Sequence, residues 1–297
     1  MRIGTRGSAL ALAQARLIAG LIAQGGAGGR GGAGGGEVAE PEIVVVSTSG
    51  DRGESAGEKA RWVDAIERAL LEGAIDLAVH SAKDVPAELA EGLELVACPA
   101  RADARDALCG AGSLAALPPR ARVGTSSLRR TAQLRALRED LEIAELRGNV
   151  DTRLRRLAEG DFDAIVLARA GLQRLGRDAG APLDELVPAA GQGTLALQAR
   201  AGEEAVTAAV APLRDRDTET ALAAERSLVR ALGADCHTAL GAHARVAGRR
   251  IELRAWIGLA DGSAWIADEL AGEDPEALGA EVARRLLAMG ARELLGA

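Results

Sequence analysis

Short apolar runs alternate with stretches of helical periodicity along most of this chain, and that alternation restricts the fold more than any other feature. Residues 42–47, 75–81 and 163–168 are apolar enough to be buried strands. Apolar residues at helical spacing follow Ser8 and again begin at Trp62. Strands separated by helices in this way form parallel or mixed sheets with helices on both faces. The chain is therefore predicted to be an α/β protein.

The same pattern divides the chain into three predicted domains. It restarts near residue 99, and the apolar run of residues 194–199 is a strand that can return to the first unit. After an amphipathic helix come three strands, the last two joined by a tight Asp-Gly turn, and a final helix. We expect two α/β lobes and a small α+β domain with a three-stranded antiparallel sheet. Their predicted bounds are residues 1–98 with 194–214, residues 99–193, and residues 215–297.

Two N-terminal segments invite misinterpretation. The first could pass for a signal peptide, but Gln14 and Arg16 interrupt its apolar run, which favours an amphipathic helix capped by Ser8. Residues 25–36 are almost pure Gly and Ala and contain a formal GxGxxG match. Because this match follows a helix rather than a strand, it does not indicate a dinucleotide site. We expect a flexible inserted loop there.

Composition argues against several classes of function. The 297 residues carry a net charge of −7 and only 1% aromatic side chains, which disfavours binding to nucleic acid by charge or by stacking. No apolar run approaches the roughly 18 residues of a membrane span. Cys98, Cys109 and Cys236 show no CxxC spacing, so neither a disulfide framework nor a zinc module is expected. A cytoplasmic location fits this cysteine usage best.

One predicted strand runs directly into polar side chains. The apolar residues that begin at Ile75 pass without a gap into His80, Ser81, Lys83 and Asp84. In an open α/β sheet, ligands and catalytic groups collect at the carboxyl ends of strands. A hydroxyl, an ammonium and a carboxylate are thus expected at one rim. Taken alone, however, the segment favours a plain strand end with a solvated Lys–Asp pair.

A basic segment stands out in this acidic chain. Residues 120–156 contain ten arginines against five acidic residues, a net charge of +5. Arg129 and Arg130 are expected to open one helix and Arg153 the next, with Arg147 ending the strand between them. Arg174 follows the strand of residues 163–168, and all these arginines are expected where strand ends and helix N-termini converge. Arginine grips carboxylates bidentately, so a convergent set indicates a ligand with several carboxylates or phosphates.

Seven segments carry a resemblance that covers nearly the whole chain. In chain order they are RIGTRGSALALAQA, VHSAKDVP, VGTSSLRRTAQL, LRGNVDTRL, AGLQRLG, PAAGQG and GADCHTALGA. Each segment is weak evidence alone, but together and in this order they are specific. The chain resembles the hydroxymethylbilane synthase family, also called the porphobilinogen deaminase family.

The resemblance implies two lobes like those of type II periplasmic binding proteins, and a third domain with a cysteine loop. It implies head-to-tail condensation of four porphobilinogen molecules into linear hydroxymethylbilane, with release of ammonia, in tetrapyrrole (heme) biosynthesis. The oligopyrrole would grow on a dipyrromethane cofactor, made from two porphobilinogen units and fixed by a thioether to Cys236. Asp84 would be catalytic, since its carboxylate can stabilise the positive charge that develops on the pyrrole nitrogens.

The resemblance also implies which residues hold these polyanions, because every pyrrole ring carries an acetate and a propionate. Besides Cys236, the expected cofactor ligands are Ser81, Lys83, Thr125, Ser127, Arg129, Arg130, Arg147 and Gly148. The expected substrate ligands are Arg6, Ser8, Arg153, Arg174 and Gln192. Lys59 and Trp62 are expected in a lid, whereas Cys98 and Cys109 are expected to be structural.

The sequence departs from the family pattern in two places. The lid motif Lys-Gly-x-Phe becomes residues 59–62, KARW, so Trp62 either covers the site or anchors its own helix. Prolines of the family are replaced by Ala104 and Ala239, which removes backbone restriction but no reactive group. Cys236 with its neighbours Asp235 and His237 could suggest a metal site, but too few ligands lie at suitable spacing, and no metal is expected.

Two other functions stay open at the level of the sequence. A non-catalytic binding protein of the same two-lobed fold would explain the arginines, but it gives Cys236 and Asp84 no task. An enzyme relic could have lost turnover through its altered lid. The expected partners are porphobilinogen and oligopyrrole polyanions, with no nucleic acid and no membrane, and the protein is expected to be a monomer.

Overall fold

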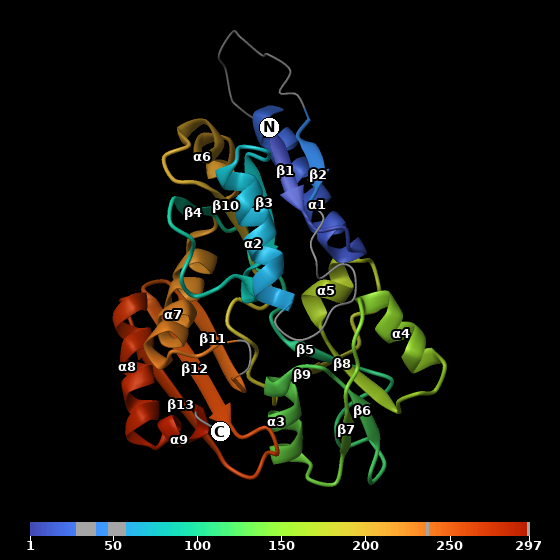
Figure 1. Cartoon of the computed structure of the whole chain (residues 1–297). Coiled ribbons are helices and arrows are strands. Elements are labelled where there is room, and N and C mark those ends of the chain that lie inside the picture. Colours follow the sequence, from blue (N-terminus) through green and yellow to red (C-terminus); the bar gives the residue numbers. More distant parts are fainter. Residues whose placement is uncertain (28–39, 47–57, 236–237, 296–297) are drawn as a thin grey trace. The chain divides into compact units, whose positions relative to one another are not determined.

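In the part of the chain that the structure describes, two five-stranded sheets and one three-stranded sheet form the framework (Figure 1). The computed structural model describes residues 1–27, 40–46, 58–235 and 238–295, with only the backbone for residues 26–27 and 58–62. The chain divides into two compact units. Unit 1 comprises residues 1–101 and 194–219, and unit 2 comprises residues 102–193 and 220–297. The division into three domains stays a prediction.

Unit 1 is built on a mixed sheet with the strand order β2-β1-β3-β10-β4. Its strands are β1 (Arg2–Thr5), β2 (Glu42–Val45), β3 (Leu77–Ser81), β4 (Leu93–Ala97) and β10 (Leu195–Arg200). β1 pairs in parallel with β2 and β3, whereas β10 runs antiparallel between β3 and β4. β10 thus brings the chain back into the first sheet, as the apolar run after residue 193 predicts.

Helices cover both faces of this sheet. They are α1 (Ala9–Ala27), α2 (Glu58–Leu71) and α6 (Glu204–Val210), with short 3-10 turns η2 (Ala82–Asp84) and η3 (Ala211–Leu213). Val79 of β3 packs in the cluster that contains Ile18 of α1, and its neighbour Ala78 packs in the cluster of Ile66 of α2. Successive strand residues point to opposite faces, so the predicted layering is confirmed.

The first residues of the predicted loop 25–36 belong to a helix instead. Helix α1 continues through Ala27, because alanine and glycine can extend a helix that already packs against the sheet. Residues 28–39 lie outside the described residues.

Unit 2 contains a second mixed sheet, in the order β7-β6-β8-β5-β9. Its strands are β5 (Asp106–Cys109), β6 (Arg122–Gly124), β7 (Glu142–Ala144), β8 (Ala164–Ala168) and β9 (Ala181–Leu183). β6 pairs in parallel with β7 and β8, and β5 runs antiparallel between β8 and β9. This order and these directions match unit 1 strand for strand. The prediction of two α/β lobes is confirmed.

Three helices accompany the second sheet, namely α3 (Leu128–Leu137), α4 (Val150–Ala158) and α5 (Arg169–Arg174). Leu134 of α3 and Leu154 of α4 pack in different clusters, one on each face of the sheet. Sequence periodicity identified α3 and α4 but missed strands β5 and β9.

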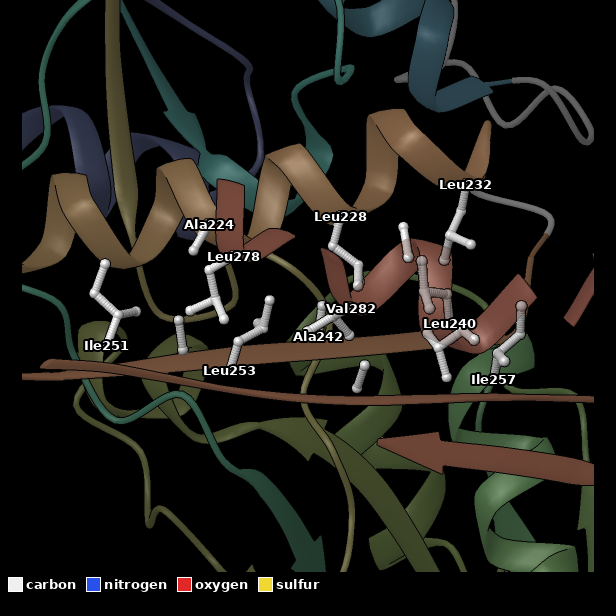
Figure 2. Packing of buried hydrophobic residues seen from close by; sticks show 14 of the residues in the cluster. Ala224, Leu228, Leu232, Leu240, Ala242, Ile251, Leu253, Ile257, Leu278 and Val282 are labelled. Carbon is white, nitrogen blue, oxygen red and sulfur yellow. The ribbon is translucent and has the colours of Figure 1, made fainter. Parts of the chain in front are cut away.

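The rest of unit 2 is the small α+β part, with a three-stranded antiparallel sheet as predicted. Its elements are α7 (Arg216–Leu232), β11 (Leu240–Ala247), β12 (Arg250–Gly258), β13 (Trp265–Gly272), α8 (Pro275–Ala288) and α9 (Ala291–Leu295). Figure 2 shows Leu228 of α7 and Val282 of α8 packing onto Leu253 of β12. Among the helices of the described residues, none is both long and apolar enough to cross a membrane.

Candidate functional site

The carboxyl end of β3 carries the first group of predicted site residues. The strand ends at Ser81, and the 3-10 turn η2 then presents Lys83 and Asp84. The amide of Ala82 donates to the carbonyl of Thr194 at 3.0 Å, which fastens the turn to the chain just before β10. The ammonium and the carboxylate therefore come from a turn tied to the sheet rather than from the strand itself.

Asp84 lines a cavity of about 80 Å³ in unit 1. Apolar side chains of α2, including Val63 and Ile66, form part of its wall. The polar lining residues come from the loop after β1, from α1 and from the end of β3, and they are Arg6, Ser8, Gln14, His80, Ser81 and Asp84. The fold thus gathers a guanidinium, two hydroxyls and a carboxylate that the sequence placed in two distant segments.

Two of the polar lining residues are positioned by hydrogen bonds. Ser8 Oγ accepts a hydrogen bond from the amide of Ala11 at 3.3 Å, which confirms the predicted N-cap of α1. Gln14 is buried, and its side-chain amide donates to Ser81 Oγ at 3.0 Å. The hydroxyl of Ser81 is therefore oriented by the helix that Ser8 caps.

A buried hydrogen-bonded chain leads away from the same cavity. His80 Nε2 lies 3.0 Å from Gln198 Oε1, and Gln198 Nε2 donates to Glu67 Oε1 at 2.8 Å. All three side chains are buried. Burial lowers the pKa of His80 to about 4, although Gln198 and Asp84 act in the opposite direction, so the ring is neutral at physiological pH. Sequence reasoning gave these residues no role, because they come from three separate elements.

In unit 2 a single buried carboxylate organises two of the predicted arginines. Asp106, at the start of β5, is fully buried. It accepts hydrogen bonds from Arg129 Nη1 at 2.7 Å, from Arg130 Nη2 at 2.8 Å and from Gln192 Nε2 at 2.8 Å. Arg129 Nη1 also donates to the carbonyl of Val187, and Arg130 Nη1 donates to the carbonyl of Val166. Three predicted ligands therefore meet at one residue that the sequence did not single out.

This cluster holds an excess of positive charge. Burial alone would raise the pKa of Asp106, but the guanidiniums of Arg129 and Arg130 hold it well below its usual range. Two buried guanidiniums against one carboxylate leave a net charge of +1 in this cluster. Arg129 Nε is buried and has no hydrogen-bond partner among the described residues. A buried, incompletely satisfied cation of this kind suits an anionic ligand.

The N-termini of α3 and α4 add further donors at the carboxyl ends of β6 and β7. Ser127 Oγ accepts from the amide of Arg130 at 3.5 Å and caps α3, while Thr125 Oγ1 accepts from the amide of Ser127 at 3.2 Å. Arg153, in the first turn of α4, donates from Nη2 to Ser126 Oγ at 3.2 Å. Burial and the neighbouring charge of Arg130 lower the pKa of Arg153 to about 10, so it is still cationic at neutral pH.

Gly148 makes the turn into α4 possible. Its φ of +108° lies in the region that favours glycine, and a Cβ there would approach Thr152 Cγ2 to 2.9 Å. Its carbonyl accepts from Arg153 Nε at 2.7 Å. The backbone at this turn therefore favours glycine, and the role of Gly148 in the site stays a prediction.

The surroundings of two further predicted ligands, Arg147 and Arg174, differ from each other. Arg147 is exposed, and its Nε donates to Glu145 at 2.7 Å. Arg174 was expected where helix N-termini converge, but it is the last residue of the six-residue helix α5, so that placement is wrong. Its Nη2 donates to the carbonyl of Gly193 at 2.6 Å, and burial lowers its pKa to about 10.

Several predicted residues lie beyond what the structure describes. Cys236 is outside the described residues, and Lys59 and Trp62 lie in α2 at positions where only the backbone is described. Within the described part of the chain, no cluster of three or more His, Cys, Asp or Glu residues could hold a metal ion. Cys98 and Cys109 are buried and form no disulfide within the described residues. Burial raises the pKa of Cys109 to about 11, which makes it a poor nucleophile.

Family models match most of the chain. The model described as porphobilinogen deaminase, dipyromethane cofactor binding domain, matches residues 1–208. The model described as porphobilinogen deaminase, C-terminal domain, matches residues 220–288.

Known proteins show the same likeness over nearly the full length. A porphobilinogen deaminase of Roseiflexus sp. (strain RS-1) is 45% identical, with 99% of this chain and 97% of the relative covered. One from Deinococcus deserti is 44% identical over the same shares. Among solved structures, a periplasmic substrate-binding protein of an ABC transporter from Coxiella burnetii is 14% identical, with a TM-score of 0.43 and coverage of 74% of this chain and 94% of that protein.

Proposed function

The chain belongs to the porphobilinogen deaminase family, and from this premise we propose how its residues share the work of the enzyme. The protein is a transferase of tetrapyrrole biosynthesis, a hydroxymethylbilane synthase that condenses four porphobilinogen molecules with release of ammonia. It carries a dipyrromethane cofactor. The assignment of individual residues to these tasks is our proposal.

We propose that Asp84 is the catalytic carboxylate. The observation that carries this assignment is that Asp84 lines one cavity together with Arg6 and Ser8. Loss of ammonia from porphobilinogen leaves a cationic ring, and a fixed carboxylate beside the pyrrole nitrogen stabilises that charge. Arg6 and Ser8 supply donors for the acetate and propionate of the same ring, which orients its nitrogen toward Asp84.

Ser81 and Lys83 complete the proposed set in unit 1. The hydroxyl of Ser81 is held by Gln14 at 3.0 Å, so it offers a donor or an acceptor in a fixed place. Lys83 neighbours Asp84 in the turn η2 and contributes a second cation for ligand carboxylates. Lys59 and Trp62 at the start of α2 are proposed to form a lid over the bound ring.

We propose that unit 2 anchors the cofactor through the excess positive charge of the buried cluster formed by Asp106, Arg129 and Arg130. The cofactor, when bound, supplies a free pyrrole α-carbon to which the next ring is joined. Its carboxylates suit Arg129, whose Nε has no partner among the described residues, and the net charge of +1 that Asp106 leaves uncompensated. Further donors are proposed from Thr125, Ser127, Arg130, Arg147 and Gly148, and Cys236 provides the thioether.

Substrate and oligopyrrole carboxylates need additional cations as the chain of rings lengthens. We propose that Arg153 and Arg174 serve them, because both are half-buried yet still charged at neutral pH. Gln192 is proposed to act from the same region, since it is tied to Asp106 at 2.8 Å.

We also propose that the protein works as a cytoplasmic monomer without a nucleic-acid or membrane partner. The net charge of −7 supports the absence of nucleic-acid and membrane partners, because an acidic surface repels phosphate backbones and anionic lipids. Light scattering coupled to size exclusion measures the mass directly. A mass near 30.4 kDa is expected, and twice that value contradicts the monomer.

The residue assignment is tested most simply at Asp84. Asp84→Ala is expected to remove turnover of porphobilinogen while the protein stays folded by circular dichroism and by its unfolding midpoint. Glu88→Ala is the matched control, because Glu88 is an exposed carboxyl four residues away that does not line the cavity. Turnover within about threefold of wild type in Asp84→Ala contradicts the assignment.

A further inference from the structure

The cavity that contains Asp84 is also lined by His80, to which the proposed function gives no task. His80 precedes Ser81 at the end of β3, and its ring reaches across to Gln198 of β10 at 3.0 Å. Gln198 in turn donates to Glu67 of α2 at 2.8 Å. Three elements of unit 1 therefore hold one imidazole at the edge of the cavity.

The direction of this hydrogen-bonded chain follows from its chemistry. The Nε2 group of Gln198 can only donate, so the oxygen of Glu67 that it contacts must accept. The amide oxygen of Gln198 can only accept, so Nε2 of His80 must carry the hydrogen. A neutral imidazole that is protonated on Nε2 has a free lone pair on Nδ1. Glu67 thus fixes the tautomer of His80 through Gln198.

The ring stays neutral for a physical reason. His80 is buried, and burial lowers its pKa to about 4. The other titratable groups around it are Asp84 in the cavity and Glu67 at the far end of the chain, and Arg6 is the cation of the same cavity. Because the imidazole is neutral, His80 places no positive charge beside the carboxylate of Asp84.

We propose that His80 positions the substrate: its ring, fixed as the Nε2–H tautomer by Gln198 and Glu67, offers Nδ1 as a hydrogen-bond acceptor to an N–H group of porphobilinogen. The inference rests on the proposed function, because it takes porphobilinogen as the ligand of this cavity. An uncharged acceptor beside Asp84 orients an N–H group without competing for the positive charge that Asp84 stabilises. The residue acts on binding and orientation, and Asp84 acts on the charge.

The tautomer can be measured without any activity. Nitrogen-15 labelling of histidine and long-range proton–nitrogen NMR distinguish the two ring nitrogens, and the signals of His80 are those lost in His80→Gln. The wild-type protein is expected to show His80 as neutral Nε2–H between pH 6 and 8. A protonated ring in that range, or the Nδ1–H form, overturns the proposal.

The same spectrum tests the chain that fixes the ring. In Glu67→Gln, residue 67 can donate, so Gln198 is free to turn and present its NH₂ group to the imidazole. The Nδ1–H form is then expected to appear. If His80 remains wholly Nε2–H in Glu67→Gln, then Glu67 does not set the tautomer and that part of the proposal is wrong.

Two substitutions at His80 separate its nitrogens in kinetics. The amide oxygen of Asn can replace Nδ1, whereas the amide of Gln reaches the place of Nε2 and keeps the contact with Gln198. His80→Gln is expected to raise KM about tenfold or more, and His80→Asn to raise it less. The opposite order shows that the contact with Gln198 alone matters, which overturns the role of Nδ1.

A ligand titration separates this inference from the proposed function. Porphobilinogen is added to labelled Asp84→Ala protein, and the expected result is a shift of the His80 Nδ1 signal. If backbone signals of Arg6 and Ser8 move while His80 Nδ1 does not, the ligand binds and the inference about His80 is wrong. If no signal of unit 1 moves, the proposed function of the cavity fails as well.

Discussion

The two five-stranded sheets repeat the same local construction and attach different chemistry to it. In unit 1 the amide of Arg2 donates to the carboxylate of Asp76 at 2.7 Å, just before β1 and β3 pair. In unit 2 the amide of Arg122 donates to Asp163 at the same distance, just before β6 and β8 pair. The two lobes therefore share this hydrogen bond as well as their strand order.

The difference begins where the third strand of each sheet ends. β3 ends in Ser81 and runs into the turn with Lys83 and Asp84, whereas β8 ends in Ala168 and runs into α5. On the antiparallel neighbour, Leu195 lies opposite Ser81 and Asp106 lies opposite Ala168. Unit 1 thus exposes its polar groups to a cavity, and unit 2 buries its carboxylate to hold arginines.

The N-capped helix after the first-paired strand of each lobe shows the same combination of shared framework and different contacts. Ser8 and Ser127 cap the helices after β1 and β6, and a buried glutamine follows each cap by six residues. Gln14 binds the hydroxyl of Ser81 in the cavity, whereas Gln133 binds the backbone of Val187. The glutamine that follows the cap therefore contacts a cavity-lining residue in unit 1, whereas in unit 2 it contacts the backbone.

The largest effect is expected when Asp106 of unit 2 is replaced by leucine, the residue that occupies the matching position, Leu195, in unit 1. Asp106→Leu leaves two buried guanidiniums without their carboxylate, and we expect it to lower the free energy of unfolding by about 3–5 kcal/mol. Urea denaturation followed by circular dichroism measures this. The control is Asp184→Ala, whose ion pair with Arg105 is exposed and is worth about 0–1 kcal/mol. Equal losses in the two variants contradict the central role of Asp106.

The buried carboxylate also predicts a dependence on pH. The pKa of Asp106 is lower in the folded protein than the ordinary value of about 4, so its stabilisation is complete above that pH and is lost as the pH falls below it. The difference in unfolding free energy between wild type and Asp106→Asn is therefore expected to shrink from pH 5 to pH 3. A difference that stays constant over this range shows that the ionised carboxylate is not its source.

A smaller effect is expected from exchanging the residues that end the third strands. Ser81→Ala removes the hydroxyl that Gln14 holds in the cavity, and we expect KM for porphobilinogen to rise about three- to tenfold. The matched change in the other lobe, Ala168→Ser, is expected to leave KM within about twofold of wild type. Steady-state kinetics of both variants check this, and a larger effect from Ala168→Ser reverses the assignment of the lobes.

The smallest effect is expected from removing the N-cap that both lobes share. Ser8→Ala and Ser127→Ala each remove an N-cap, so each is expected to lower the free energy of unfolding by about 1 kcal/mol. Urea titrations of the two variants provide the comparison. Only Ser8→Ala is also expected to raise KM through the cavity. No loss of stability in either variant contradicts the shared capping role.

Features that depend on neighbouring residues were predictable from the sequence. The cap at Ser8 could be identified, and the second cap could be narrowed to Ser126 or Ser127, because a cap and the amide it serves are three residues apart. The strands with Val79 and Ile165 are apolar runs long enough to be recognised. The polar end of β3 followed from the same run, which passes directly into Ser81.

Features that depend on distant partners could not be predicted. Gln198 and Glu67 are separated by 131 residues, and nothing local to either marks the contact. Asp106 lies 23 residues from Arg129 in a strand that sequence periodicity missed, so the arginines were predicted as ligands without their buried carboxylate. The misplacement of Arg174 has the same origin, because α5 has only six residues and its end could not be located.

The central claim is that unit 1 carries the catalytic carboxylate and unit 2 carries the anchored cofactor. The intact mass of the purified protein under denaturing conditions, followed by peptide mapping, tests it most directly. The expected result is an excess equal to two pyrrole units on the peptide that contains Cys236, which lies in the range of unit 2. An unmodified mass after incubation with porphobilinogen, or the excess on the peptide of Cys98 in unit 1, contradicts this division.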